Sequence, residues 1–313
     1  VAYLDQELKI KQIPDYPGAI NGLQLRGKKN INKVGAAVDA ALPVIEEAAK
    51  ENIDLLLVHH GLFWGGTQRI DGALYKKIKT AMDSGMAIYS SHIPLDIHSR
   101  FGNNVLFAKS IGLTKGIPFL DWQGIHTGLR FNVEMNRSTL LKKIEKTLQN
   151  KIHIAPGGPA KIKKLGVITG GAGTYVDAVA KEGIDTFITG EGQHHTFTMA
   201  EELGINLIYA GHYATETFGV TSLANHLAKK YKLEMIGIRS RTMWLSTMLR
   251  EYASNRFKSR VDKNISSCRA VKPTLSLPKL LSIDFLSNTL KDKSTGIRRK
   301  EEVNKLVKRL LKS

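Results

Sequence analysis

Two adjacent histidines, His59 and His60, end the apolar run 55–58 and are followed by Gly61. Such a run is typical of a buried strand that delivers polar side chains to its carboxyl end, where open α/β sheets carry their chemistry. Successive side chains point to opposite faces, so both imidazoles serve one site only if the strand breaks there, which Gly61 permits. Two neighbouring metal ions suit this pair better than one. The alternative is a pair of polar residues that only ends a strand.

Two further histidines are each followed by a carboxylate four positions later: Asp96 follows His92, and Glu216 follows His212. On a helix this spacing places both side chains on one face, so His212 and Glu216 can bind one cluster. Imidazole nitrogen and carboxylate oxygen suit zinc, iron, manganese, cobalt or nickel. A carboxylate can also bridge two such ions ~3.5–4 Å apart, with a hydroxide held between them. A lone pair with this spacing is usually a solvated helical pair, but the histidine pair and the second His-x-x-x-acid favour a metal site.

These motifs lie in an internal repeat. Residues 49–54 match residues 180–185 at five of six positions, and residues 88–92 share the pattern Ile-Tyr-x-x-His with residues 208–212. Internal repetition indicates two related structural units. Apolar periodicity predicts strands over residues 31–37, 53–58, 87–91, 164–169, 184–189, 206–210 and 233–238, with helices over 42–51, 75–84, 175–182 and 197–203.

We therefore expect an α/β fold with two similar α/β domains, residues 1–125 and 126–238, and a C-terminal extension, residues 239–313. The chain of 313 residues is 42% hydrophobic and 24% charged, as in an ordinary globular protein. Its one cysteine, Cys268, excludes an internal disulfide and a cysteine-rich metal site. The apolar runs are shorter than the ~18 residues of a membrane span, and the first residues lack a targeting pattern, so we expect a cytoplasmic protein without a membrane partner.

The net charge of +18 is concentrated at one end of the chain. Residues 239–313 hold 19 Lys and Arg against 6 Asp and Glu, or +13, whereas residues 1–238 hold 27 against 22, or +5. The body therefore gives no electrostatic reason to expect a nucleic-acid partner. Weak, nonspecific nucleic-acid binding through the basic extension is one hypothesis. The other, which we favour, is an ill-packed extension or an out-of-frame junction in the gene.

The order of six short motifs resembles that of the Nif-three-like dinuclear metal-centre hexameric proteins, many of which are named GTP cyclohydrolase class one, type two. The resemblance spans about residues 3–238, and its motifs are residues 21–24, 59–64, 92–96, 102–104, 190–191 and 211–216. It implies two similar α/β domains in a Nif-three-like fold, a toroidal homo-hexamer and a dinuclear metal site that faces an internal cavity.

Carried over position by position, the resemblance implies two divalent transition-metal ions per chain. His59 and His212 would bind one ion, His60 and Asp96 would bind the other, and Glu216 would bridge both.

Other residues near these motifs have supporting roles in the prediction. His92 and Glu191 hold the places of His212 and His60 in the repeat, so we expect them to line the cavity as supports of the ligands or as proton-transfer groups. Phe63 and Trp64 are predicted to pack rather than to stack on a base.

Two functions are compatible with these ligands. The first is a metal-dependent hydrolase in which a bridging hydroxide attacks an electrophilic carbon or phosphorus of a small-molecule substrate. In its cyclohydrolase form, the substrate is GTP, the attack falls on purine C8, and the imidazole ring opens with release of formate. The second is a non-enzymatic hexamer that binds or delivers metal or acts in regulation. His92 and Glu191 favour the enzyme, because metal storage needs no spare acid or base.

Overall fold

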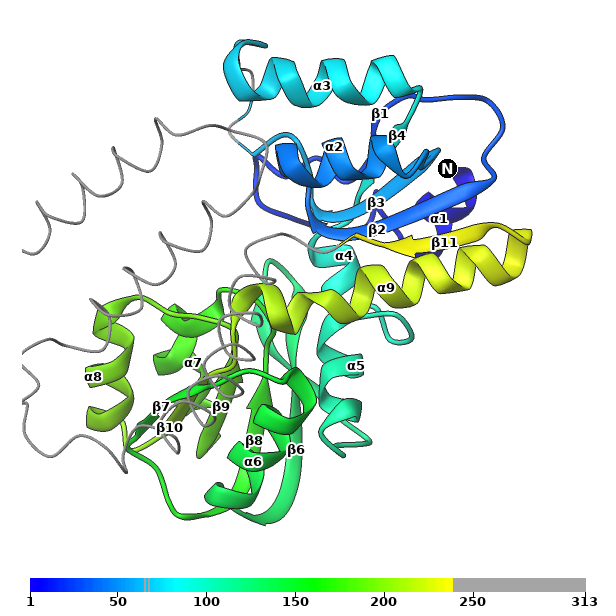
Figure 1. The fold of residues 1–313 in the computed structure, drawn as a ribbon. Coiled ribbons are helices and arrows are strands. Elements are labelled where there is room, and N and C mark those ends of the chain that lie inside the picture. Colours follow the sequence, from blue (N-terminus) through cyan, green and yellow to red (C-terminus); the bar gives the residue numbers. More distant parts are fainter. Residues whose placement is uncertain (65, 67, 239–313) are drawn as a thin grey trace, which may run out of the picture. The chain divides into compact units, whose positions relative to one another are not determined.

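The computed structural model describes residues 1–64, 66 and 68–238, which form two mixed β-sheets with helices packed against them (Figure 1). The basic extension and its expected nucleic-acid contacts lie outside the described residues. None of the helices within residues 1–238 that the structure describes has the length and apolar character of a membrane span.

The first sheet has five strands and the second has six. In spatial order the first contains β1 (Gly22–Leu25), β4 (Ala87–Ser90), β3 (Leu55–His60), β2 (Lys33–Asp39) and β11 (Glu234–Gly237). The second contains β5 (Ile117–Trp122), β6 (Ile125–Asn136), β8 (Lys161–Val167), β9 (Thr186–Thr189), β10 (Asn206–Tyr209) and β7 (His153–Pro156). The helical segments are α1 (Ala2–Glu7), α2 (Leu42–Lys50), α3 (Gly72–Ser84), α4 (Ile93–Asp96), α5 (Asn103–Ser110), α6 (Arg137–Leu148), the 3₁₀ turn η1 (Ala172–Tyr175), α7 (Val176–Lys181), α8 (His194–Glu202) and α9 (His212–Tyr231).

The two sheets repeat one strand order. Parallel strands β2, β3 and β4 correspond to β8, β9 and β10, and each set has an antiparallel edge strand next to its third member, β1 or β7. The strand next to the first member of each set differs in direction. Strand β11 runs parallel to β2, whereas β6 runs antiparallel to β8. The expected division between residues 125 and 126 falls inside the β5–β6 hairpin, and β11 joins the first sheet from the end of the second half. The domain boundaries therefore stay a prediction.

The matched segments 49–54 and 180–185 make the same connection between helix and strand. Asp54 Oδ2 accepts hydrogen bonds from the amides of residues 32–33 at 2.9 and 3.0 Å, and Asp185 Oδ2 accepts from the amides of residues 163–164 at 2.8 and 2.9 Å. Each carboxylate thus ties the turn before one strand to the start of the neighbouring strand.

The single mismatch in these segments, Asn52 opposite Gly183, has a backbone explanation. Both residues follow a helix in the left-handed region, with φ of 56° and 74°. Glycine, and to a lesser degree asparagine, adopts this conformation at low cost.

The parallel strands are buried on both faces. Leu55 and Leu57 belong to a core cluster with α1 and α9, whereas Leu56 and Val58 face α2 and α3. In the second sheet, α5 and α6 cover one face, while α7 and α8 cover the other. This two-sided burial explains why the strands appear in the sequence as continuous apolar runs.

Strand β3 extends two residues beyond the predicted run and includes both His59 and His60. The chain leaves the sheet at Gly61. Since β2, β3 and β4 are parallel, their carboxyl ends lie at one edge of the first sheet. The polar residues that follow these strands therefore gather there.

We expect Asp54→Asn to lower the free energy of unfolding by about 1–3 kcal/mol near neutral pH, because two amides lose a charged, buried acceptor. Burial opposes the charge of Asp54, but hydrogen bonds from Asn32 and Lys33, with Lys28 nearby, outweigh it and hold the pKa below its usual value. A carboxyl with a lowered folded pKa stabilises the protein above its unfolded pKa of about 4, and this contribution is lost as pH falls through the folded pKa.

Urea unfolding of both proteins near neutral pH and in acid measures the difference, which should shrink in acid. Asp83→Asn is the matched control, because Asp83 only pairs with Lys79 on the exposed face of α3. Equal unfolding free energies of wild type and Asp54→Asn near neutral pH would contradict the assignment.

Candidate metal centre

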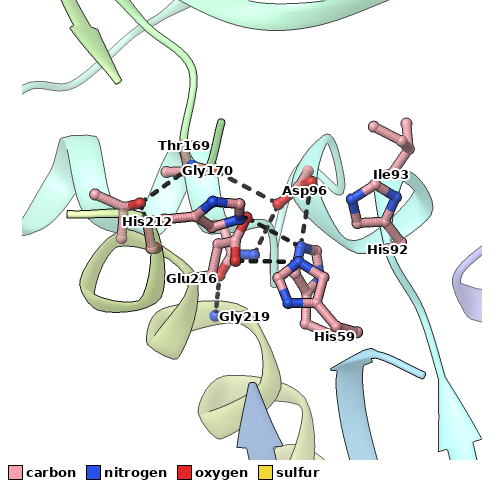
Figure 2. Close-up of polar contacts among 12 residues, drawn as sticks. His59, His92, Ile93, Asp96, Thr169, Gly170, His212, Glu216 and Gly219 are labelled. Carbon is pink, nitrogen blue, oxygen red and sulfur yellow. Dashed lines mark hydrogen bonds and ion pairs between the residues drawn. The ribbon is translucent and has the colours of Figure 1, made fainter. Parts of the chain in front are cut away.

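The two histidines of β3 meet one buried carboxylate of α9. The rings of His59 and His60 lie 4.8 Å apart. His59 Nε2 lies 3.4 Å from Glu216 Oε1, and His60 Nε2 lies 3.4 Å from Glu216 Oε2. His212, at the start of α9, brings its Nε2 to 3.0 Å from Glu216 Oε1. Figure 2 shows the Glu216 carboxylate next to His212 and His59, and Asp96 also pairs with His59. One carboxylate thus contacts three imidazoles.

The donor atoms fall into three groups, within each of which all ligand atoms lie within 4.8 Å of one another. The groups are His59 with Asp96 and Glu216, His60 with His212 and Glu216, and His59 with His60 and His92. Glu216 is shared by two of them. The grouping differs from the pairing that the sequence resemblance implied, because it joins His212 to His60 and Asp96 to His59.

Each imidazole of the cluster is oriented by a hydrogen bond from its Nδ1–H to an oxygen. The acceptors are the Ser91 carbonyl for His59 (2.9 Å), Asp39 for His60, Asp15 for His92 and Glu191 for His212 (2.8 Å each). With Nδ1 protonated, the lone pair of the neutral ring is on Nε2. This arrangement is typical of metal-binding histidines, whose second nitrogen is held by a carbonyl or carboxylate.

The Asp96 carboxylate is fixed by neighbouring side chains. Asn103 Nδ2 donates to Asp96 Oδ1 at 2.7 Å, and the Thr169 hydroxyl donates to the same oxygen at 3.4 Å. The Asn103 carbonyl oxygen accepts the amide of Gly219 at 2.7 Å, which determines the orientation of the Asn103 side chain. Asp96 is therefore coupled to α9, the helix that carries Glu216.

The protonation of the cluster follows from its burial and its mixed charges. Burial opposes the charge of Glu216, but attraction to His59 and contacts with His212 and His60 outweigh it, so the Glu216 pKa lies well below its usual value. Burial opposes the charge of His212 as well, but Glu216 and Glu191 raise the His212 pKa to about 9. Imidazoles and carboxylates therefore favour each other's charged forms.

Two buried atoms of the centre have no hydrogen-bond partner, His59 Nε2 and Glu216 Oε2. Buried polar groups are nearly always paired, and an orphaned one costs about 1–3 kcal/mol. In the neutral imidazole, His59 Nε2 is an electron-pair donor, as is the oxygen of the ionised carboxylate, and a bound cation would replace the proton that the carboxylates otherwise favour on the ring. Both residues belong to the groups with metal-ligand spacing. A divalent cation would satisfy them, so the residues fit a metal site. Nitrogen and oxygen ligands of this kind suit zinc, iron, manganese, cobalt or nickel.

The structure brings together the residues that the sequence singled out. His59, His60, Asp96, His212 and Glu216 form the two groups that share Glu216. In addition, His92 lies beside them, with its ring centroid 4.9 Å from that of His59. Glu191 touches the centre only through His212, and 64% of its side chain is exposed.

Three supporting residues were not predicted: Asp15, Asp39 and Asn103. Asp39 could have been found, since it ends β2, the parallel neighbour of β3, and pairs in register with His60. Asp15 comes from a turn-rich loop, and only the tertiary fold brings it to His92.

A cavity of about 380 Å³ lies against the donor groups. Its lining includes His60, His92, Asp96, His212 and Glu216, together with four aromatic residues, Tyr16, Trp64, Trp122 and Tyr175. Phe63 packs against a core cluster as predicted, but Trp64 differs: it lines the cavity and is 39% exposed.

The fold and this cluster define an α/β protein with groups of histidine and carboxylate side chains at metal-ligand spacing. The chain belongs to the Duf34/NIF3 (NGG1p interacting factor 3) family, whose model matches residues 1–243. This finding confirms the resemblance noted in the sequence. A relative in Deinococcus radiodurans named GTP cyclohydrolase 1 type 2 homolog is 39% identical over 234 residues, which are 74% of this chain and 88% of that protein. A relative of the same name in Haemophilus influenzae is 37% identical over 235 residues, covering 74% and 93%.

Solved structures show the same fold. TTHA1606 from Thermus thermophilus has a TM-score of 0.69 and 36% identity, with 76% of this chain and 95% of that chain covered. Reduced HcgD from Methanocaldococcus jannaschii has a TM-score of 0.68 and 28% identity, with the same coverage.

We expect Gly170→Ala to reduce metal binding. A Cβ at Gly170 would lie 2.3 Å from Glu216 Oε1, so the carboxylate must move. Since metal affinity depends on ligand position, we expect a loss of roughly ten-fold or more in affinity. Gly124→Ala is the matched control, because Gly124 has a similar φ (81° against 73°) but no atom within 4 Å of its Cβ. Metal titration with each purified protein measures the effect, and equal affinities of the two variants would contradict it.

Proposed function

We propose that the protein is a hydrolase that depends on two divalent transition-metal ions per chain. One observation carries the proposal: a single buried carboxylate, Glu216, is shared by two groups with ligand spacing, and two of the donor atoms are orphaned. In this assignment His59, Asp96 and Glu216 would hold one ion, while His60, His212 and Glu216 would hold the other. The ions would supply Lewis acidity, lowering the pKa of a water molecule and neutralising charge that develops on the substrate.

His92 is the proton-transfer group in this proposal. Its Nδ1–H donates to Asp15 Oδ1 at 2.8 Å, so its Nε2 is available at the cavity it lines. Asp15 is in turn held by the side chain of Asn21 at 2.8 Å and by the amide of Ile93 at 3.1 Å. These contacts fix the tautomer and the orientation of the imidazole, which a group that receives and returns a proton requires. Glu191 orients His212 and lies at the exposed edge of the centre.

The substrate in this proposal is a nucleotide, and the reaction is of the GTP cyclohydrolase type. Its support is the name GTP cyclohydrolase 1 type 2 homolog, which relatives 33–39% identical to this chain carry. The reaction opens the imidazole ring of the purine at C8 and releases formate. A non-enzymatic metal-binding, delivery or regulatory protein would need the same ligands but would not need the Asp15–His92 pair.

The decisive experiment combines metal analysis with a turnover screen on GTP, other nucleotides and small phosphoesters. Wild type should hold close to two transition-metal ions per chain. Glu216→Ala should lose most of both, because two like-charged ions then lack the anion between them. His92→Gln should keep its metal but lose roughly 10²–10⁴-fold in turnover, the usual contribution of general acid–base catalysis.

Glu202→Ala and His153→Gln are the controls, since both residues are exposed, belong to none of the donor groups and do not line the cavity. One ion or none in wild type after anaerobic loading would refute the dinuclear centre. A metal-loaded wild type that turns over no substrate would favour the metal-binding alternative.

We also propose that the chain assembles as a toroidal homo-hexamer, with the family resemblance as support. Light scattering on the full-length protein measures the mass. Six chains of 34.6 kDa are expected, and a monomeric mass would contradict the proposal.

A further inference from the structure

The cavity at the metal centre has an unusual concentration of aromatic side chains from separate parts of the chain. Tyr16 comes from the loop before β1, Trp64 from the segment after β3, and Trp122 from the end of β5. None of the three belongs to the core clusters formed by the described residues. Tyr16 and Trp64 are 44% and 39% exposed. Burial in the core therefore does not explain their presence, and an exposed aromatic group in a cavity points to a ligand.

The three rings and the imidazole of His92 form a row beside the donor groups, with His92 between Tyr16 and Trp64. The centroids of Tyr16 and Trp122 are 5.1 Å apart, and Tyr16 lies 5.9 Å from His92. On the other side of the row, Trp64 meets His92 at 4.9 Å and His60 at 5.6 Å, edge to face in both cases. The row thus runs from Trp122 to the imidazole of a proposed metal ligand.

Contacts within the protein hold two of these rings. The Trp64 indole N–H donates to the Gly61 carbonyl at 3.2 Å, which holds the ring next to the end of β3. Burial, followed by the contact with Tyr175, raises the pKa of Tyr16 to about 12, so its phenol is neutral. Rigid aromatic groups lose little conformational entropy on binding, so stacking on them is favourable.

The charged groups of the cavity point to the same ligand chemistry. Among the described residues that line it, there is no lysine or arginine. Apart from two tyrosines, the titratable residues in the lining are three histidines and the two acids of the proposed metal centre. A phosphate group would therefore find no lysine or arginine there, and the imidazoles are those that the proposed function assigns to the metal ions and to proton transfer. Small or aliphatic residues, Ile168, Gly171 and Ala172, complete the wall and leave room for a flat group.

We propose that Tyr16, Trp64 and Trp122 bind the planar heteroaromatic ring of the substrate, and that the side chains of the cavity recognise this ring rather than phosphate. This proposal rests on the proposed function, since the three aromatic residues would hold the ring of the substrate against the metal centre. It makes the three residues determinants of specificity. Where the substrate has phosphate groups, they contribute to binding affinity through contacts with the metal ions or with residues outside the cavity.

The test is ligand binding to full-length, metal-loaded protein by titration calorimetry, with guanosine, ribose 5-phosphate and inorganic triphosphate as probes. Guanosine should bind to wild type, and ribose 5-phosphate should bind much more weakly. Trp64→Leu and Trp122→Leu should each weaken guanosine binding by roughly ten- to hundred-fold, the usual effect of losing a stacked base. Both should leave triphosphate binding unchanged, and Trp122→Phe should restore most of the guanosine affinity.

Tyr75→Leu is the control, because Tyr75 is 51% exposed on α3 and does not line the cavity. Metal content is measured for every variant, so that a loss of metal is not mistaken for a loss of ring binding. Guanosine affinity unchanged in both tryptophan variants would overturn the inference, as would wild type that does not bind guanosine.

The outcomes separate this inference from the proposed function. Turnover that depends on Glu216 but not on the tryptophans would retain the hydrolase and reject the aromatic surface. Guanosine binding that depends on the tryptophans, in a protein without turnover, would retain the aromatic surface and reject the hydrolase.

Discussion

The structure of the centre depends on one buried carboxylate. Glu216 is 2% exposed, and three imidazoles contact its oxygens. A charge removed from water in this way is tolerated only with opposite charges or a metal ion next to it. The neighbours therefore have to be held in place. Each imidazole has its own acceptor, and Asp96 has its own donors, so the polar network extends outward to the Ser91 carbonyl after β4 and to the backbone of α9 at Gly219.

The internal repeat explains how one chain builds an asymmetric centre. When the two halves are aligned by their strand registers, Lys33 of the first half is equivalent to Lys164 of the second. In the same alignment Asp39 is equivalent to Gly170, and His59 is equivalent to Gly190. The first half thus carries side chains where the second half carries glycine.

Space explains this difference. A Cβ at Gly190 would lie 2.6 Å from both the Gly170 carbonyl oxygen and His212 Cα, and one at Gly170 would meet Glu216. The second half has glycine at these positions, and His212 and Glu216 occupy the space that side chains there would need. Two similar units therefore form one centre rather than two.

Much of this organisation can be predicted from the sequence, because local pattern carries it. The apolar runs, the His-His pair and the two His-x-x-x-acid motifs predict the parallel strands and the donor set, since neighbouring parallel strands end at the same edge of a sheet. We did not predict β5, β6 and α6 from the sequence, although β6 alternates apolar and polar residues from Leu129 to Asn136, the pattern of a half-buried strand. The return of β11 to the first sheet was not predicted either, because no local pattern specifies which sheet a strand joins. Only the tertiary structure decided which donors share a group, and only it brought Asp15 to His92 and three distant aromatic rings to one cavity. Local pattern determines which element a residue belongs to and which face it occupies, but contacts between residues far apart in the chain depend on the packing of whole sheets.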